Sequence, residues 1–123
     1  MLGEVLTAIV TPFKADGSVD LERFRPLDDA HRRDARIRLG LPVTAELIVS
    51  ISRLVPRKGF DVAIEAAALL APRRPDLLLA ISGGGRDERR LRRLAVERKA
   101  PVRFLGRVAN DRLPVLYGCG DVF

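Results

Sequence analysis

The sequence is poor in the residues that thiol and metal chemistry need. Its 123 residues include one cysteine, Cys119, and one histidine, His31. A single cysteine cannot form an intramolecular disulfide, and the two residues offer no Cys/His cluster for a structural zinc site. We therefore expect no metal and no cofactor, and we assign no catalytic residue.

Long apolar runs are missing as well. No stretch reaches the ~20 apolar residues of a membrane-spanning helix, and Gly3 and Glu4 stand where a secretory signal would carry basic and then apolar residues. We predict a soluble, cytoplasmic protein. With 47% hydrophobic and 31% charged residues, the composition and length are those of one globular domain.

Aromatic residues are few, at 5% with no tryptophan, whereas positive charge is abundant, with a net charge of +6. Positive charge favours polyanions. However, 19 of the 22 basic residues are arginine. Together with heavy alanine, leucine, glycine and proline usage, this is typical of the coding bias of a GC-rich genome. Because base-stacking platforms are scarce, we expect no specific nucleic-acid binding.

Hydrophobic periodicity and turn residues divide the chain into short elements. An apolar run predicts a strand over residues 4–13, followed by a turn over 14–18. A basic segment predicts a helix over residues 28–39, with Asp28 and Asp29 at its start. The later pattern predicts strands over 47–51, 77–81, 102–105 and from 121, and helices over 60–71, from Asp87, and over 111–117.

Alternating strands and helices predict an α/β protein. The rhythm favours a doubly wound parallel sheet of three to four strands with helices on both faces. Residues 4–13 would add an extra N-terminal strand, which either pairs at a sheet edge or stays loosely attached. An unpaired edge also leaves open a non-enzymatic role, self-association through that edge.

A basic motif, RLVPRKGFD, follows the first of these sheet strands and leads into a helix. Ligands of open α/β sheets bind at the carboxyl ends of strands, where a helix N-terminus favours phosphate. Arg53 and Lys58 therefore suit a diphosphate, by fork geometry and point charge respectively. The alternative is a solvated basic loop that only connects strand to helix.

Three glycines, residues 83–85, follow the second strand of this sheet. Glu88 stands in the third position of the dinucleotide-binding fingerprint, so that pattern fails, as does the pattern of a P-loop. The run is either a plain strand-to-helix turn or a turn near the ligand.

Six motifs together are specific: VDLERFRPLDD, RLGLP, SRLVPRKGFD, ISGGG, RFLGRV and LYGCGDVF. In this order, residues 19–123 resemble the Rossmann-like nucleotide-sugar-binding domain of glycosyltransferase family 4. The resemblance implies that Arg53 and Lys58 neutralise the donor diphosphate without a metal ion. It also implies that Val108 and Asn110 lie beside the nucleobase.

The family's glutamate pair would follow Phe123, and its acceptor-binding domain would precede Val19. We therefore expect a truncated donor-binding domain that binds a nucleotide sugar or nucleoside diphosphate weakly and transfers no sugar.

Residues 3–18, GEVLTAIVTPFKADGS, resemble instead the first strand of the dihydrodipicolinate synthase and N-acetylneuraminate lyase family. We accordingly divide the chain at residues 1–18 and 19–123 and expect a chimera or fusion. Lys14 lies in a predicted exposed turn, so we do not interpret it as that family's Schiff-base lysine.

Two further expectations concern single residues. His31 is predicted on a polar helix surface with no carboxylate placed to tune it. Asp87 is predicted to cap the helix that follows the glycine run.

Overall fold

A parallel β-sheet forms the centre of the molecule. The computed structural model describes residues 14–18, 20, 22–23 and 25–123, and the strand predicted over residues 4–13 lies outside them. In the described residues the sheet has three strands, β1 (Glu46–Ile51), β2 (Leu77–Ser82) and β3 (Val102–Gly106), in that spatial order. Both strand pairs are parallel, which confirms the predicted fold class.

The last residues of the chain extend this sheet beyond β1. Val122 forms a single parallel bridge with Ile48, and the Val49 N–H donates to the Val122 carbonyl at 2.9 Å. Because β2 occupies the other side of β1, the spatial order is Val122, β1, β2, β3. The fourth strand predicted from residue 121 is therefore present as a bridge.

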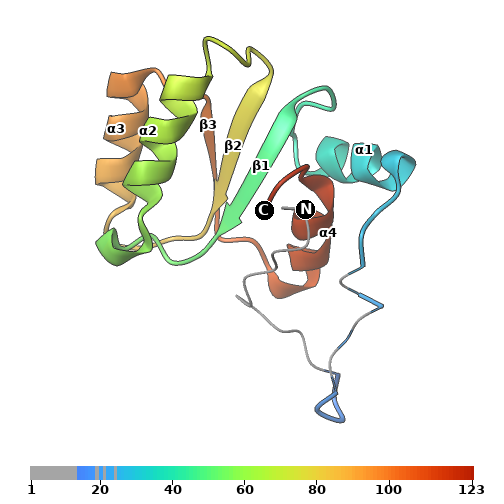
Figure 1. The fold of residues 1–123 in the computed structure, drawn as a ribbon. Coiled ribbons are helices and arrows are strands. Elements are labelled where there is room, and N and C mark those ends of the chain that lie inside the picture. The colour runs from blue at the N-terminus through green and yellow to red at the C-terminus, as the bar shows by residue number, and fades with distance from the viewer. Residues whose placement is uncertain (1–13, 19, 21, 24) are drawn as a thin grey trace.

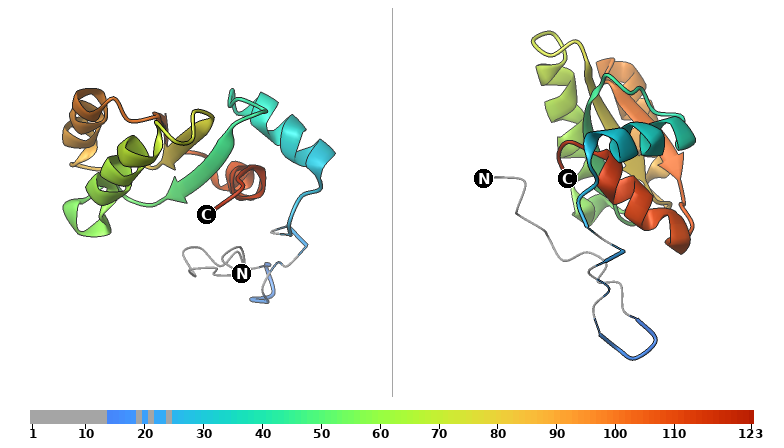
Figure 2. Two further views of the ribbon diagram at one scale, coloured as in Figure 1. Left: turned by 45° about the horizontal axis from the view of Figure 1, so that its top comes forward. Right: turned by 90° about the vertical axis from the view of Figure 1, so that its right-hand side faces the viewer.

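Helices cover both faces of the sheet, as Figures 1 and 2 show. On one face α2 (Phe60–Leu70) packs beside α3 (Glu88–Arg98), and on the other α1 (Asp29–Arg38) packs beside α4 (Leu113–Cys119). Two short 3-10 helices, η2 (Pro56–Lys58) and η3 (Asn110–Arg112), precede α2 and α4. None of the helices described is long and apolar enough to cross a membrane.

The alternating side chains of the strands build one apolar layer on each face. Leu47 and Val49 of β1 pack with Leu116 on the side of α1 and α4. Leu79 and Ile81 of β2 pack on the side of α2 and α3. All of these side chains are at most 2% exposed. Each large apolar side chain buried in this way contributes about 1.5–3 kcal/mol, so the two layers hold the sheet edges in fixed positions.

Helix boundaries follow the predicted signals with two corrections. The Asp28 carboxylate accepts from the His31 N–H at 2.9 Å and caps α1, but it also lies 2.7 Å from His31 Nδ1. The expectation that no carboxylate stands beside His31 was therefore wrong. Asp87 holds the N-cap position of α3 without a capping bond from its side chain, because its carboxylate binds Arg90 instead, at 2.7 Å.

Candidate functional site at the carboxyl edge of the sheet

The loops that follow the three strands meet at one edge of the sheet. The Leu54 N–H, after β1, donates to the Gly84 carbonyl at 3.0 Å, and the Leu54 carbonyl accepts from the Asp87 N–H at 3.0 Å. The Gly83 N–H, after β2, donates to the Gly106 carbonyl at 2.8 Å. Backbone hydrogen bonds therefore fix the three loops relative to one another.

Glycine is needed where these loops touch. A Cβ atom at Gly83, whose φ is +134°, would stand 1.8 Å from the Ser52 carbonyl oxygen. A Cβ atom at Gly85 would stand 2.3 Å from the Leu54 carbonyl oxygen. The glycine run thus serves close backbone packing and brings the loop after β2 against the loop after β1.

A cavity of about 360 Å³ opens in this edge. Its lining includes the side chains of three exposed arginines, Arg53, Arg57 and Arg86, with Val55 and Pro56 as its apolar part. Arg53 belongs to the loop after β1, and Arg86 directly follows the glycine run after β2. The fold therefore brings together cations that are far apart in the sequence.

Lys58, the second predicted diphosphate ligand, is exposed but is not among the residues that line this cavity. It ends η2, and Gly59, with a φ of +72°, turns the chain from η2 into α2. Lys58 therefore stands at the N-terminal end of α2, where the helix dipole favours an anion.

The predicted nucleobase residues lie in the next loop, after β3. Val108 is half-buried and lines a second cavity, of about 370 Å³, together with Arg107. Asn110 is exposed at the start of η3 and does not line it. The Asn110 carbonyl accepts from Arg23 Nη2 at 3.3 Å.

Arg107, which lines the second cavity, reaches the glycine run. A Cβ atom at Gly84 would stand 2.8 Å from Arg107 Nε, so this side chain lies over the glycine run. Sequence reasoning had not assigned Arg107, Arg57 or Arg86 to a site. The available signal was that each lies in a segment that connects a predicted strand to the next predicted helix, since the carboxyl ends of parallel strands share one edge.

The cations of this edge are not neutralised internally. Within the described part of the chain, Arg53, Arg57, Lys58 and Arg86 donate no side-chain hydrogen bond and form no ion pair. Asp87, adjacent to Arg86 in sequence, is 6% exposed and bound to Arg90. That hydrogen bond from Arg90 holds the pKa of Asp87 below its usual range.

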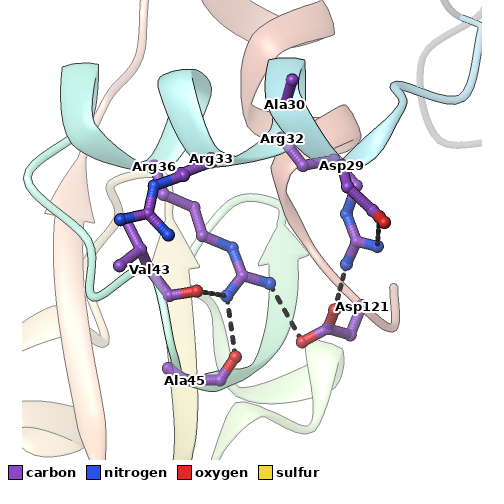
Figure 3. Close-up of a pocket in the computed structure, with 8 residues that line it drawn as sticks. All are labelled: Asp29, Ala30, Arg32, Arg33, Arg36, Val43, Ala45 and Asp121. Carbon is purple, nitrogen blue, oxygen red and sulfur yellow. Dashed lines mark hydrogen bonds and ion pairs between the residues drawn. The ribbon is translucent and has the colours of Figure 1, made fainter.

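The opposite, amino edge of the sheet carries another cavity, of about 430 Å³, lined by Arg32, Arg33 and Arg36 of α1 (Figure 3). Here Arg32 and Arg36 have carboxylate partners, whereas Arg33 is exposed and forms no ion pair among the described residues. Arg36 donates to the carbonyl oxygens of Cys119 at 2.8 Å and Ala45 at 2.7 Å, and it pairs with Asp121 at 2.9 Å.

Asp121 ties this cluster to the sheet. It also pairs with Arg32, and it accepts from the Leu47 N–H at 2.8 Å. Burial alone would raise the pKa of Asp121, but the Leu47 donor and the two guanidinium groups outweigh burial and lower that pKa. Because Arg36 and Asp121 form an ion pair, the side chains at the amino edge connect α1 to β1 and to the end of the chain.

No metal centre accompanies either edge: among the described residues, no three Cys, His, Asp or Glu side chains lie close enough to hold an ion.

The parallel sheet has the spatial order β3, β2, β1 and then the bridge at Val122, which is the fourth strand along the chain. This order, with helices on both faces and cationic loops at the carboxyl ends of the strands, defines the Rossmann-like class of nucleotide-binding folds.

Comparison with known proteins narrows the class. The chain belongs to the family of glycosyl transferases group 1, which it matches over residues 31–123. A GDP-mannose-dependent monoacylated alpha-(1-6)-phosphatidylinositol monomannoside mannosyltransferase from Corynebacterium glutamicum is 40% identical over 105 residues. The match covers 85% of this chain and 28% of that protein. The chain thus spans about a quarter of the length of the curated relatives it matches.

Two solved structures share the fold. One is the C-terminal domain of a glycosyl transferase group 1 family protein, LpcC, from Francisella tularensis, with a TM-score of 0.70 at 22% identity, covering 85% of this chain and 56% of that one. The other is Anabaena HepE in complex with UDP-glucose, with the same TM-score and identity, covering 85% of this chain and 29% of that one. The likeness of residues 3–18 to the lyase family receives no support from these comparisons.

Proposed function

We propose that this segment is the donor-binding part of a glycosyltransferase and binds a nucleoside diphosphate sugar at the carboxyl edge of its sheet. The observation that carries the proposal is Arg53, an exposed cation that lines the cavity at the end of β1 and has no ion-pair partner among the residues that the structure describes. Family membership and the Rossmann-like fold support it.

In this proposal the donor diphosphate is held by Arg53, in the loop before η2, and by Lys58, the last residue of η2. Arg53 offers a fork to phosphate oxygens, and Lys58 offers a point charge beside the first turn of α2. Both cations stabilise the charge that develops on a departing nucleoside diphosphate. Val108 and Asn110 are proposed to lie beside the nucleobase.

The relatives indicate which nucleotide sugars to use as probes for the donor. The Corynebacterium relative is named as GDP-mannose-dependent, and HepE was solved with UDP-glucose. GDP-mannose and UDP-glucose are therefore the two sugars to test. We propose weak binding without transfer by this segment, because transfer needs a second wall that excludes water from the reacting groups.

The test is a calorimetric titration of both nucleotide sugars into the wild-type chain and into an Arg53→Ala/Lys58→Ala variant. We expect the variant to bind at least about tenfold more weakly, since each charged hydrogen bond contributes about 1.5–3 kcal/mol. Arg38→Ala/Lys14→Ala is the matched control, because it removes the same charges from exposed positions outside the edge loops. Equal affinity of all three proteins, or no binding by wild type at millimolar ligand, would contradict the proposal.

Self-association through a sheet edge stays a prediction, as does cytoplasmic localisation. The edge that this prediction concerns is the one beside Val122, on the side of β1 opposite β2. A monomeric mass in light scattering would count against self-association.

A further inference from the structure

The cavity at the carboxyl edge holds more positive charge than the proposed function uses. Three arginines line this cavity, and the proposed diphosphate site includes one of them, Arg53. The other two are Arg57 and Arg86. Arg57 comes from η2, and Arg86 comes from the loop between β2 and α3.

Three arginines of the neighbouring helix α3 have carboxylate partners, whereas Arg89 and Arg93 form no ion pair among the described residues. On α3, Arg90 binds Asp87 and Asp61, Arg92 pairs with Glu88, and Arg98 binds Glu65. In contrast, Arg57 and Arg86 are exposed and form no ion pair with any residue that the structure describes. Asp87 binds Arg90 and acts on Arg86 only through its charge, so the guanidinium hydrogen-bond donors of Arg57 and Arg86 remain available to a ligand.

Backbone hydrogen bonds fix the chain segments that carry Arg53, Arg57 and Arg86. The Leu54 N–H donates to Gly84, and the Asp87 N–H donates to Leu54. Residues adjacent to Arg53 and Arg86 in sequence are thus bonded to each other. Arg57 is held by η2, in which the Lys58 N–H donates to the Val55 carbonyl at 3.0 Å.

We propose that Arg57 and Arg86 form, with Arg53, a phosphoryl-binding subsite in this cavity, an inference that rests on the proposed function and adds two ligand-binding residues to it. Three guanidinium groups around one cavity repel one another, and a multiply charged anion relieves that repulsion. Guanidinium forks match the geometry of phosphate oxygens, so the ligand class is a phosphate or pyrophosphate group.

Inorganic pyrophosphate is the direct probe, because it needs no nucleobase or sugar contact. We compare its dissociation constant for wild type, for Arg57→Gln/Arg86→Gln, and for the control Arg89→Gln/Arg93→Gln, which removes two charges from exposed positions of α3 outside the cavity lining. The cavity variant should bind about tenfold more weakly. The dissociation constant of the control variant for pyrophosphate should change less than about twofold at 0.15 M salt, because salt screens interactions between charges more than ~8 Å apart.

Equal affinity of the cavity variant and the control overturns the inference, and so does a wild-type chain that binds no pyrophosphate at millimolar concentration. Thermal unfolding of each variant checks that the substitutions leave the fold intact, as expected for exposed side chains without partners.

GDP and UDP, titrated in parallel into wild type, the Arg53→Ala/Lys58→Ala variant and the Arg57→Gln/Arg86→Gln variant, separate this inference from the proposed function. Pyrophosphate binding that depends on Arg57 and Arg86, with no binding of GDP or UDP, keeps the inference and removes the proposed function. Nucleotide binding that depends on Arg53 and Lys58 but not on Arg57 and Arg86 keeps the proposed function and removes the inference.

Discussion

The two edges of the sheet use arginine in opposite ways. At the amino edge, Arg36 has a side chain that is 5% exposed, donates to backbone carbonyls and pairs with Asp121. At the carboxyl edge, Arg53, Arg57 and Arg86 line a cavity and have no carboxylate partner among the described residues. Arginine content alone therefore does not identify a binding site. Burial and the presence of partners separate structural arginines from those available to a ligand.

The difference has a physical cause. A guanidinium group taken out of water must regain its hydrogen bonds inside the protein, and the amino edge supplies carbonyls and a carboxylate for this purpose. Exposed guanidinium groups keep their hydration and can exchange it for phosphate oxygens. The comparison predicts large losses of stability at the amino edge and losses of binding at the carboxyl edge.

The largest expected effect is at Arg36. Arg36→Ala leaves the Cys119 and Ala45 carbonyls without their donor and removes a partner of Asp121. We expect the free energy of unfolding to fall by about 3 kcal/mol. Urea unfolding measures it. Arg38→Ala, an exposed change on the same helix, should cost less than about 0.5 kcal/mol, and similar costs for the two would mean that Arg36 does not hold α1 to the sheet.

The next effect concerns the glycine contact between the loops. Gly83→Ala places a Cβ atom 1.8 Å from the Ser52 carbonyl oxygen at a φ of +134°. We expect a loss of about 2–3 kcal/mol and weaker nucleotide binding, because the two loops must separate. Gly106→Ala is the control, since its φ is +70° with no atom within 4 Å, and it should cost about 1 kcal/mol. Equal costs for the two variants would show that close packing of these loops is not required.

The smallest expected effect is the acid dependence of Asp121. Because the fold lowers the pKa of Asp121, its contribution is complete above the unfolded value of about 3.9 and disappears as the pH falls through the lowered pKa of the folded state. At pH 7, Asp121→Asn should cost about 1–2 kcal/mol, limited by the partial exposure of the side chain. The gap between wild type and variant should close below about pH 4. Urea unfolding across this pH range measures the gap, and a gap that stays constant would remove Asp121 from the acid response.

Much of the fold was predictable from local signals. The apolar runs at β1 and β2 indicated strands, and Asp28 and the glycine run marked boundaries that the structure contains. Asp87 was misread because its carboxylate has two competing donors, and the Arg90 guanidinium one turn later binds it more strongly than a backbone N–H would. The carboxylate beside His31 was missed because the bond by which Asp28 caps α1 also brings the His31 ring close to that carboxylate.

The candidate site was predictable only in part. Arg53 and Lys58 share one motif, so the sequence places them near each other, but Arg86 and Arg107 belong to different loops. Their approach depends on strand order and on backbone contacts at Gly83 and Gly84. Arg36 and Asp121, 85 residues apart, likewise gave no local sign of their pairing.

The order of helices and strands, the two-faced burial of the sheet and the position of a cationic motif after β1 were already determined by the amino-acid sequence, because they depend on periodicity and on neighbouring residues. Only the tertiary structure decided which charges are available. Whether an arginine meets a carboxylate or solvent depends on side chains that distant segments bring within hydrogen-bond reach, and those distances exist only once the sheet is assembled.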